Sequence, residues 1–160
     1  MLPFFVSDAI MADVYSTLTA LSLQKNYGGI IGKSLIQAVC TNRLRFKSHW
    51  FWNGPQHYPE LPSDIIGDFM QADVVIFKGD VNYRRLLSDR DWPEDEKIER
   101  IINYCPFKVL IIRTLKSEII VGLPKGKAEE LTKIDKNWKI NGKRGIIQLI
   151  KPTKIDSKIS

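Results

Sequence analysis

The chain has 160 residues, of which 44% are hydrophobic and 26% are charged. This length and this balance predict one globular domain and exclude a disordered chain. No apolar run approaches the roughly 18 residues of a membrane-spanning helix, and no basic segment precedes Asp8. We therefore expect neither a membrane protein nor a secretory signal peptide.

The net charge is +6, which suits an anionic partner such as a small phosphorylated molecule. The basic residues are scattered and are not interleaved with aromatic residues, so nucleic-acid binding is not predicted. The two cysteines, Cys40 and Cys105, lie far apart and form no CxxC pair. We expect no zinc site and no disulfide, two small core residues, and a cytoplasmic location.

The hydrophobic pattern predicts strands that alternate with helices in chain order. We expect a strand at residues 4–6, a helix from 10 to 21 that ends near 26–29, an aromatic strand or loop at 50–52, and a short helix from 62–64 to 70. A strand follows at 74–77, then helices at 83–87 and 94–104, strands at 109–112 and 119–121, a helix at 127–134 and a strand at 146–150. The wholly apolar runs at 74–77 and 109–112 are typical of strands buried on both faces.

This alternation predicts an α/β fold, a three-layer sandwich in which a mainly parallel sheet is flanked by helices. Ligands of such sheets gather outside the carboxyl ends of the strands. Three polar segments follow predicted strands, namely Ser7-Asp8, Lys78-Gly79-Asp80 and Arg113-Thr114-Leu115-Lys116. Two carboxylates can hold a divalent metal and arginine with lysine can hold an anion, which together favour phosphoryl chemistry.

Each of these candidates also has a purely structural interpretation. Asp8 is well placed to cap the following helix, and Asp80 is well placed to form a turn. Arg113 and Lys116 can form surface ion pairs with an acid such as Glu118. Their convergence on one sheet edge favours the functional interpretation.

Two other motifs carry less weight. The run from Gly28 to Ser34 lacks the first glycine of a P-loop and follows a helix rather than a strand, so nucleotide binding is not predicted. His49 and His57 flank a tryptophan-rich segment, in which a loop with packed aromatic side chains explains the pattern better than a metal pair.

A family resemblance rests on three strings of residues: Val75-Ile76-Phe77-Lys78-Gly79-Asp80-Val81-Asn82-Tyr83-Arg84, Asp89-Arg90-Asp91-Trp92 and Arg113-Thr114-Leu115-Lys116. With these strings the chain resembles the metal-dependent damage-control phosphatases, in the eukaryotic branch with an Arg-Thr-x-Lys signature. The same family also carries the name acidic-residue (protein-glutamate) methyltransferase. Shorter matching segments include Pro3-Phe4-Phe5-Val6-Ser7-Asp8 and Val121-Gly122-Leu123, and the resemblance runs from about residue 2 to residue 150.

The resemblance implies which residues form the site. Asp8 matches a ligand of the divalent metal, which would be manganese, cobalt or nickel. Asp80, Val81, Asn82, Tyr83 and Arg84 match the segment that contacts the sugar phosphate, and Lys116 matches the lysine that closes on the substrate. The expected catalytic residues are thus Asp8, Asp80 and Lys116, with Arg113 or Arg84 also offsetting charge at the phosphate. The implied reaction is hydrolysis of small sugar phosphates, fructose 1-phosphate and fructose 6-phosphate among them.

The chain departs from the family pattern in its length. Family members are more than twice as long and carry, upstream, an adjacent Asp-Asn pair that supplies two further metal ligands; no Asp-Asn dipeptide occurs in this chain. We therefore expect residues 1–150 to be the C-terminal part of the family's α/β domain, followed by a disordered tail at 151–160. Such an incomplete domain would be a weak catalyst alone, and the missing N-terminal half would be its partner.

Two alternative functions stay open beside the phosphatase. The first is S-adenosylmethionine-dependent methylation of protein glutamates, which the family name also covers. No glycine-rich cofactor loop follows the first predicted strand, which disfavours it. The second is a non-catalytic remnant that binds sugar phosphates, which the missing Asp-Asn pair favours and the retained site residues disfavour.

Overall fold

The computed structural model describes residues 9–151. The strand expected at residues 4–6, Asp8, and the tail from residue 152 lie outside this described part. The chain divides into two compact units, residues 1–55 and 56–160. None of the helices within residues 9–151 is both long and apolar enough to cross a membrane.

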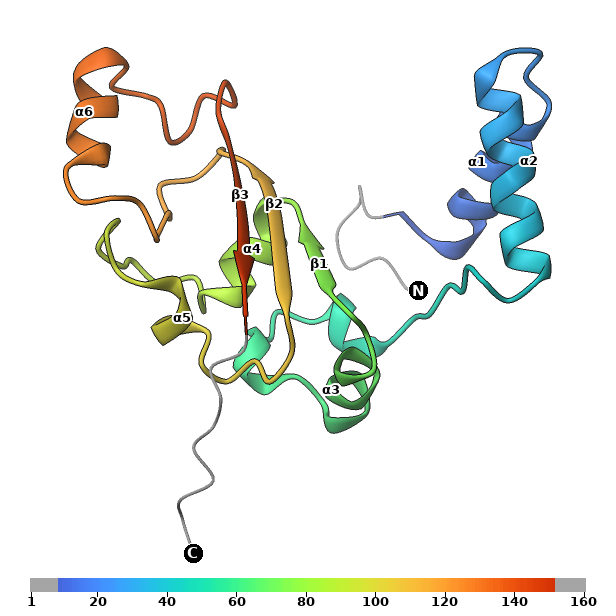
Figure 1. Ribbon diagram of the computed structural model, residues 1–160, viewed down its shortest axis with the longest axis horizontal. Coiled ribbons are helices and arrows are strands. Elements are labelled where there is room, and N and C mark those ends of the chain that lie inside the picture. Colours follow the sequence, from blue (N-terminus) through green and yellow to red (C-terminus); the bar gives the residue numbers. More distant parts are fainter. Residues whose placement is uncertain (1–8, 152–160) are drawn as a thin grey trace, which may run out of the picture. The chain divides into compact units, whose positions relative to one another are not determined.

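The first unit is built on a helical hairpin, α1 (Met11–Ser22) and α2 (Tyr27–Cys40), followed by a 3-10 turn, η1 (Trp50–Asn53) (Figure 1). The Asn26 side chain begins α2 by accepting a hydrogen bond of 2.8 Å from the Gly28 N–H. At two glycines of α2 the preceding chain comes very close: Gly29 faces the loop residue Gln24, and Gly32 faces the end of α1. A Cβ atom at Gly29 would lie 1.9 Å from the carbonyl oxygen of Gln24, and one at Gly32 would lie 2.4 Å from the Ser22 nitrogen.

Two expectations for this unit are wrong. The glycine-rich run does not end the first helix, which already stops at Ser22, but forms the first turns of α2. These glycines are needed for close helix packing, which a single-helix pattern does not reveal. Cys40 is exposed at the end of α2 and not in the core, whereas Cys105 is buried as expected.

The second unit carries the sheet. In chain order its elements are η2 (Tyr58–Glu60), α3 (Ser63–Met70), β1 (Val75–Lys78), α4 (Asp80–Leu86), α5 (Ile98–Ile101), β2 (Val109–Thr114), α6 (Lys127–Ile134) and β3 (Gly145–Ile150) (Figure 1). The strands expected at 74–77, 109–112 and 146–150 and the helices expected at 62–70, 83–87 and 127–134 are confirmed, with ends that differ by a few residues.

Two predicted elements differ because their backbones bond elsewhere. Residues 94–96 bond to the loop at 122–123, and residues 119–121 bond to the side chains of Arg113, Tyr83 and Gln148. The helix expected over 94–104 shrinks to α5, and residues 119–121 form no strand. The carbonyl oxygens of Glu94 and Glu96 accept the N–H groups of Leu123 and Gly122 at 2.8 and 3.0 Å. Since these carbonyls bond to a distant loop, they do not support a helix at 94–97.

The three strands form a mixed sheet in the order β1-β2-β3, which confirms the α/β class. β1 runs parallel to β2, with Val75 beside Val109, and β3 runs antiparallel to β2, with Ile150 beside Val109. The buried face carries Phe77, Val109 and Ile111, and α4 contacts both parallel strands. The core therefore lies between this face and the helices that follow the strands.

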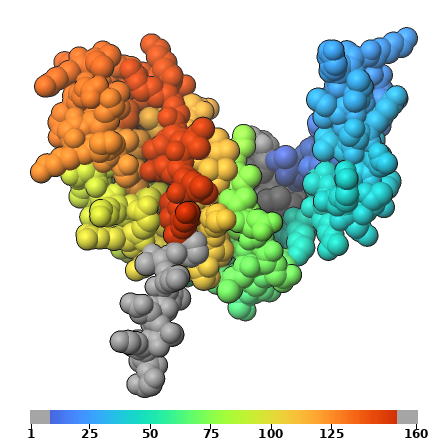
Figure 2. Space-filling model, viewed as in Figure 1, coloured from blue at the N-terminus to red at the C-terminus, as the bar shows by residue number. Residues whose placement is uncertain are grey.

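The opposite face of the sheet is apolar but not buried. Ile76, Ile147 and Leu149 are 55%, 74% and 58% exposed, and Leu110 and Ile112 beside them are half-buried. Figure 2 shows the atoms of β3, coloured red, at the surface of this unit. The expectation that 74–77 and 109–112 are buried on both faces is therefore wrong for this chain: their side chains alternate between a buried and an open face.

Candidate active site at the carboxyl edge of the parallel strands

The parallel pair β1 and β2 ends at one edge of the sheet and brings two predicted residues together. Gly79 follows β1, and its N–H donates to the carbonyl oxygen of Ile112 at 2.9 Å. Its φ of +102° is a conformation that favours glycine, and it turns the chain from the strand into α4. Asp80 is the first residue of that helix, and its Oδ1 lies 2.9 Å from the Nε of Arg113 on β2.

The guanidinium of Arg113 is enclosed by the protein. Its side chain is 0% exposed. Nη1 donates to the carbonyl oxygen of Ile119 at 2.5 Å, and Nη2 donates to the carbonyl oxygen and the Oγ of Ser117 at 3.1 and 2.7 Å. Its contact with Asp80 has the distance of an ion pair, but the N–H direction lies outside hydrogen-bond geometry. Burial lowers the pKa of this guanidinium, and the charge of Asp80 partly offsets that effect.

Asp80 presents its two carboxylate oxygens differently. Oδ1 faces Arg113 and also accepts a hydrogen bond of 3.2 Å from the Ser117 hydroxyl. Within the described residues Oδ2 has no hydrogen-bond or ion-pair partner, and the side chain is 20% exposed. One oxygen is therefore fixed and the other is available to accept a hydrogen bond from a ligand.

The aromatic ring of Tyr83 lies beneath this ion pair. The Arg113 guanidinium carbon is 4.3 Å from the centre of the ring, and the Tyr83 hydroxyl accepts the Val121 N–H at 3.1 Å. Tyr83 is fully buried, and burial raises the pKa of its hydroxyl above the usual value. The structure therefore places Tyr83 in the support of the site rather than on its surface.

The other residues of the predicted substrate segment lie on the first turns of α4. Val81 is 60% exposed. The side chain of Asn82 is held at both ends, because Nδ2 donates to the carbonyl oxygen of Lys78 at 2.7 Å and Oδ1 accepts from the Tyr58 hydroxyl. Arg84 binds Asp89 through two hydrogen bonds of 2.6 and 2.7 Å.

The charges of this segment influence one another. Hydrogen bonding to Asp89 raises the pKa of Arg84, and nearby Asp80 adds to that effect. The same hydrogen bond lowers the pKa of Asp89. The positive charge of Arg84 also contributes to lowering the pKa of Arg113, so the two guanidinium groups lie close enough to repel each other.

Lys116 is exposed, and no hydrogen bond or ion pair with another described residue engages it. Its backbone neighbours are fixed on both sides. The Leu115 N–H donates to the carbonyl oxygen of Arg144 at 2.9 Å and its carbonyl oxygen accepts the Gly142 N–H at 3.0 Å, while Ser117 binds Arg113. A free ammonium on an anchored backbone suits the binding of an anion.

The described residues do not fit a divalent metal by themselves. Within residues 9–151 no group of three His, Cys, Asp or Glu side chains could hold an ion. Asp80 Oδ1 already faces a guanidinium, whose positive charge opposes a cation at that oxygen. Asp8, the metal ligand expected from the family resemblance, lies outside the described residues.

Two supporting residues were not predicted. Ser117 bridges Arg113 and Asp80, and Tyr58 fixes Asn82 from a separate segment of the chain. The position of Ser117 after the strand-end lysine was a usable signal, since hydroxyls at strand ends often bind charged groups. No sequence pattern relates Tyr58 to Asn82, because the contact depends on tertiary packing.

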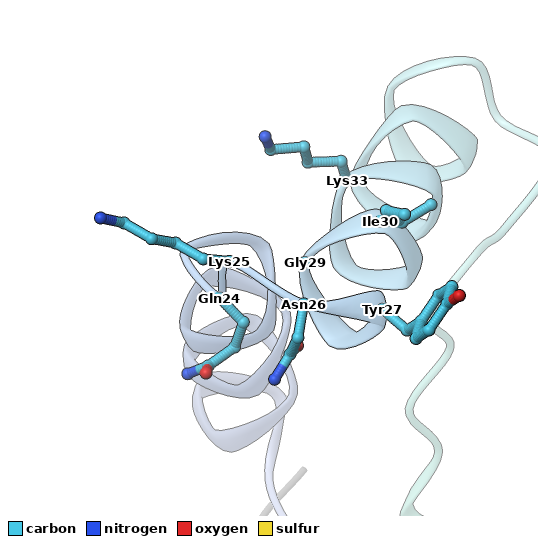
Figure 3. A pocket seen from close by; sticks show the side chains of 7 residues that line it. All are labelled: Gln24, Lys25, Asn26, Tyr27, Gly29, Ile30 and Lys33. Carbon is cyan, nitrogen blue, oxygen red and sulfur yellow. The ribbon is translucent and has the colours of Figure 1, made fainter.

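A separate hollow lies at the turn of the helical hairpin and is lined by Gln24, Lys25, Asn26, Tyr27, Gly29, Ile30 and Lys33 (Figure 3). Figure 3 shows Lys25 and Lys33 extending away from the turn rather than toward a common point. The glycine-rich run here is helical and is not the strand-loop-helix of a P-loop. We find no convergent set of polar groups in this hollow.

Comparison with known proteins identifies the family. Residues 1–131 match the model of the damage-control phosphatase ARMT1-like domain. The chain belongs to this family. It is 32% identical over 156 residues to damage-control phosphatase ARMT1 of Xenopus tropicalis and 32% identical over 153 residues to that of Homo sapiens, in each case over 92% of this chain. The mouse protein of the same name is 37% identical over 114 residues, or 69% of this chain.

These matches cover only part of the relatives. The chain spans 35% of the Xenopus tropicalis protein, 34% of the human protein and 26% of the mouse protein. The family resemblance found in the sequence is therefore confirmed. For this chain, the activity of the longer relatives is a proposal.

Proposed function

We propose that this chain binds small phosphate monoesters, sugar phosphates first among them, at the carboxyl edge of β1 and β2 and contributes to their hydrolysis. The observation that carries the proposal is the pair of unlike groups at this edge. Asp80 offers one oxygen with no partner among the described residues, and Lys116 offers an exposed ammonium on an anchored backbone. Membership of a damage-control phosphatase family supports the same chemistry.

The proposed roles follow from charge. The Lys116 ammonium pairs with the phosphate dianion, and Asp80 Oδ2 accepts a hydrogen bond from a sugar hydroxyl. Arg84 adds positive charge near Asp80. In the reaction a water oxygen bonds to phosphorus, the ester P–O bond breaks, and a proton passes to the leaving sugar oxygen. The products are inorganic phosphate and the free sugar.

A divalent metal remains part of the proposal through the family resemblance. Asp8 would bind the manganese, cobalt or nickel ion, and the remaining ligands of the metal would come from outside residues 9–151. A polypeptide equivalent to the N-terminal part of the longer relatives is the proposed partner, because these relatives are about three times as long as the matched region. A cytoplasmic location is proposed with it.

The test is phosphate release from fructose 1-phosphate with manganese, measured on the purified full chain. Lys116→Gln is expected to lower kcat/KM about 10-fold or more, because it removes the positive charge at the phosphate. Asp80→Asn is expected to lower it by about 100-fold, because it removes the carboxylate that binds the sugar and leaves buried Arg113 without its ionic partner. Lys133→Gln and Asp95→Asn are matched controls, since both residues are exposed and remote in sequence from the site. They should retain wild-type rates.

Circular dichroism and melting temperature separate loss of function from loss of fold. Lys116→Gln is the decisive variant, because Lys116 is exposed and its substitution leaves no buried charge unpaired. A folded chain whose phosphate release is unaffected by Lys116→Gln contradicts the proposal. Methyl transfer from S-adenosylmethionine to an acceptor protein, without phosphate release, would favour the alternative enzyme.

A further inference from the structure

Arg113 is the one charged residue within residues 9–151 that is fully buried. Each of its three guanidinium nitrogens contacts protein oxygen atoms, and these belong to two segments. Asp80 lies on the first turn of α4, and Ser117 and Ile119 lie in the loop that follows β2. The ring of Tyr83 covers one face of the guanidinium, and the side chain as a whole is 0% exposed. A ligand at the sheet edge finds no open side of Arg113.

The contacts of Arg113 require a planar fork. The oxygens that it binds point at three different nitrogens, whereas a lysine has one. The loop that it holds contains Lys116, whose neighbours are fixed by Arg113 on one side and by the Arg144 and Gly142 backbones on the other. Tyr83 extends the same support, because its hydroxyl accepts the N–H of Val121 further along the loop.

We infer that Arg113 is a positioning residue that fixes Asp80 Oδ1 and the Lys116 loop and does not itself contact the phosphate. This inference rests on the proposed function only for the identity of the ligand, a small phosphate monoester. It changes the role that the family resemblance implied, in which Arg113 offsets charge at the phosphate. Asp80 Oδ2 and the Lys116 ammonium are the two groups that contact the ligand. Arg113 fixes the positions of both groups.

The direct test is nuclear magnetic resonance of the full chain with ¹⁵N-labelled arginine and lysine, titrated with fructose 1-phosphate. The Arg113 guanidinium N–H signals should exchange with solvent at least about 10-fold more slowly than those of exposed Arg90. They should shift much less on titration than the signals of Lys116. Arg113 signals that follow the same saturation curve as Lys116, at equal or larger amplitude, overturn the inference.

The titration also distinguishes failure of the inference from failure of the proposed function. If fructose 1-phosphate shifts no signal, the proposed ligand is wrong, while slow exchange at Arg113 still supports the positioning role. If the Arg113 protons exchange as fast as those of Arg90, the positioning role of Arg113 is wrong whether or not the ligand binds.

Variants test the positioning step. Arg113→Lys keeps the charge but loses the fork, so amide exchange at 117–121 should accelerate about 10-fold or more. Amides of β2 and β3 should change less than about 2-fold. Arg90→Lys is the matched control. Unchanged exchange at 117–121 in a folded Arg113→Lys chain overturns the inference.

Tyr83→Phe and Ser117→Ala are milder variants to use if Arg113→Lys fails to fold. Tyr83→Phe removes one hydrogen bond of the same support and Ser117→Ala removes two, and each should accelerate exchange at 117–121 by a smaller factor than Arg113→Lys. In phosphate release, either variant should lower kcat more than it raises KM. The opposite split, with KM raised and kcat unchanged, would assign this cluster to ligand binding and overturn the positioning role.

Discussion

Arg113 and Lys116 are close in the chain and carry the same charge, yet their environments are opposite. Arg113 is sealed between α4 and the loop after β2, and Lys116 is open to solvent. A buried guanidinium is tolerated because Asp80 offsets its charge and two backbone carbonyls accept its Nη hydrogens. The charge that can meet a ligand is therefore the lysine, and the arginine determines the geometry around it.

At the same scale, the Arg84–Asp89 pair gives a pH prediction. Hydrogen bonding to Arg84 lowers the pKa of Asp89 in the folded state. The stabilisation is therefore present above the unfolded pKa of about 3.8 and is lost as the pH falls through the folded pKa. Asp89→Asn should destabilise the chain at pH 7 by less than about 1 kcal/mol, because both side chains are roughly 40% exposed and screened.

The measurement is the melting temperature of both proteins between pH 7 and pH 2.5. The difference between wild type and Asp89→Asn should vanish at the acid end. Asp89 has a φ of +52°, which asparagine also tolerates, so the substitution tests the charge and not the backbone. Asp95→Asn, at an exposed position outside the Arg84–Asp89 pair, is the control. A difference that grows in acid would contradict this account.

The convergence of Asp80 and Arg113 was predictable from sequence, because parallel strands end at the same edge of a sheet. Whether Arg113 or Lys116 is exposed to a ligand was not predictable. The enclosure of Arg113 depends on the path of residues 115–122, and that path is fixed by hydrogen bonds to Glu96, Tyr83 and Gln148 from distant parts of the chain. Strand-end rules place residues at an edge but do not say which side chains the next loop covers.

At the scale of elements, the strands show how burial decides the effect of a substitution. Ile111, in the middle of β2, is fully buried, whereas Ile147 on the paired strand β3 is 74% exposed. Ile111→Ala should cost about 2–5 kcal/mol of unfolding free energy through lost burial and a residual cavity. Ile147→Ala should cost less than about 1 kcal/mol, mostly from reduced strand propensity.

Urea unfolding followed by tryptophan fluorescence measures both variants. Trp138 is a suitable probe because it is buried in the second unit. The two substitutions remove the same atoms, so each is the control for the other. Equal destabilisation by the two variants would mean that Ile147 is covered in solution. It would contradict the finding that this face of the sheet is exposed.

Elements with a strong local pattern were the predictable ones. α6 occupies the expected residues 127–134, and β2 contains the apolar run that defines it. The helix expected over 94–104 was shortened because Glu94 and Glu96 bond to the loop at 122–123. The strand expected at 119–121 did not form because its backbone bonds to the side chains of Arg113, Tyr83 and Gln148. The second helix of the hairpin was missed because glycines such as Gly28 and Gly29 usually end helices, whereas here they lie against the loop residue Gln24, and Gly32 lies against the end of α1.

At the scale of the whole molecule, the open face of the sheet is the feature that most departs from an ordinary globular surface. Aliphatic side chains from all three strands, Ile76, Leu110, Ile112, Ile147 and Leu149, lie on it. A contiguous apolar surface of this kind marks an interaction site or a tendency to associate. The chain also spans only about a third of its curated relatives, which fits the incomplete domain expected from the sequence.

The open face predicts binding of an apolar dye such as ANS to the folded chain. The double variant Ile147→Thr with Leu149→Thr should reduce ANS fluorescence by about half or more, because it removes apolar area while threonine preserves strand propensity. Ile134→Thr is the control, since Ile134 is 68% exposed but lies on α6, outside the sheet. Circular dichroism should be unchanged in both variants. An equal loss of fluorescence in the control, or none in the double variant, would locate the apolar surface elsewhere, because dye binding follows contiguous apolar area rather than any single exposed side chain.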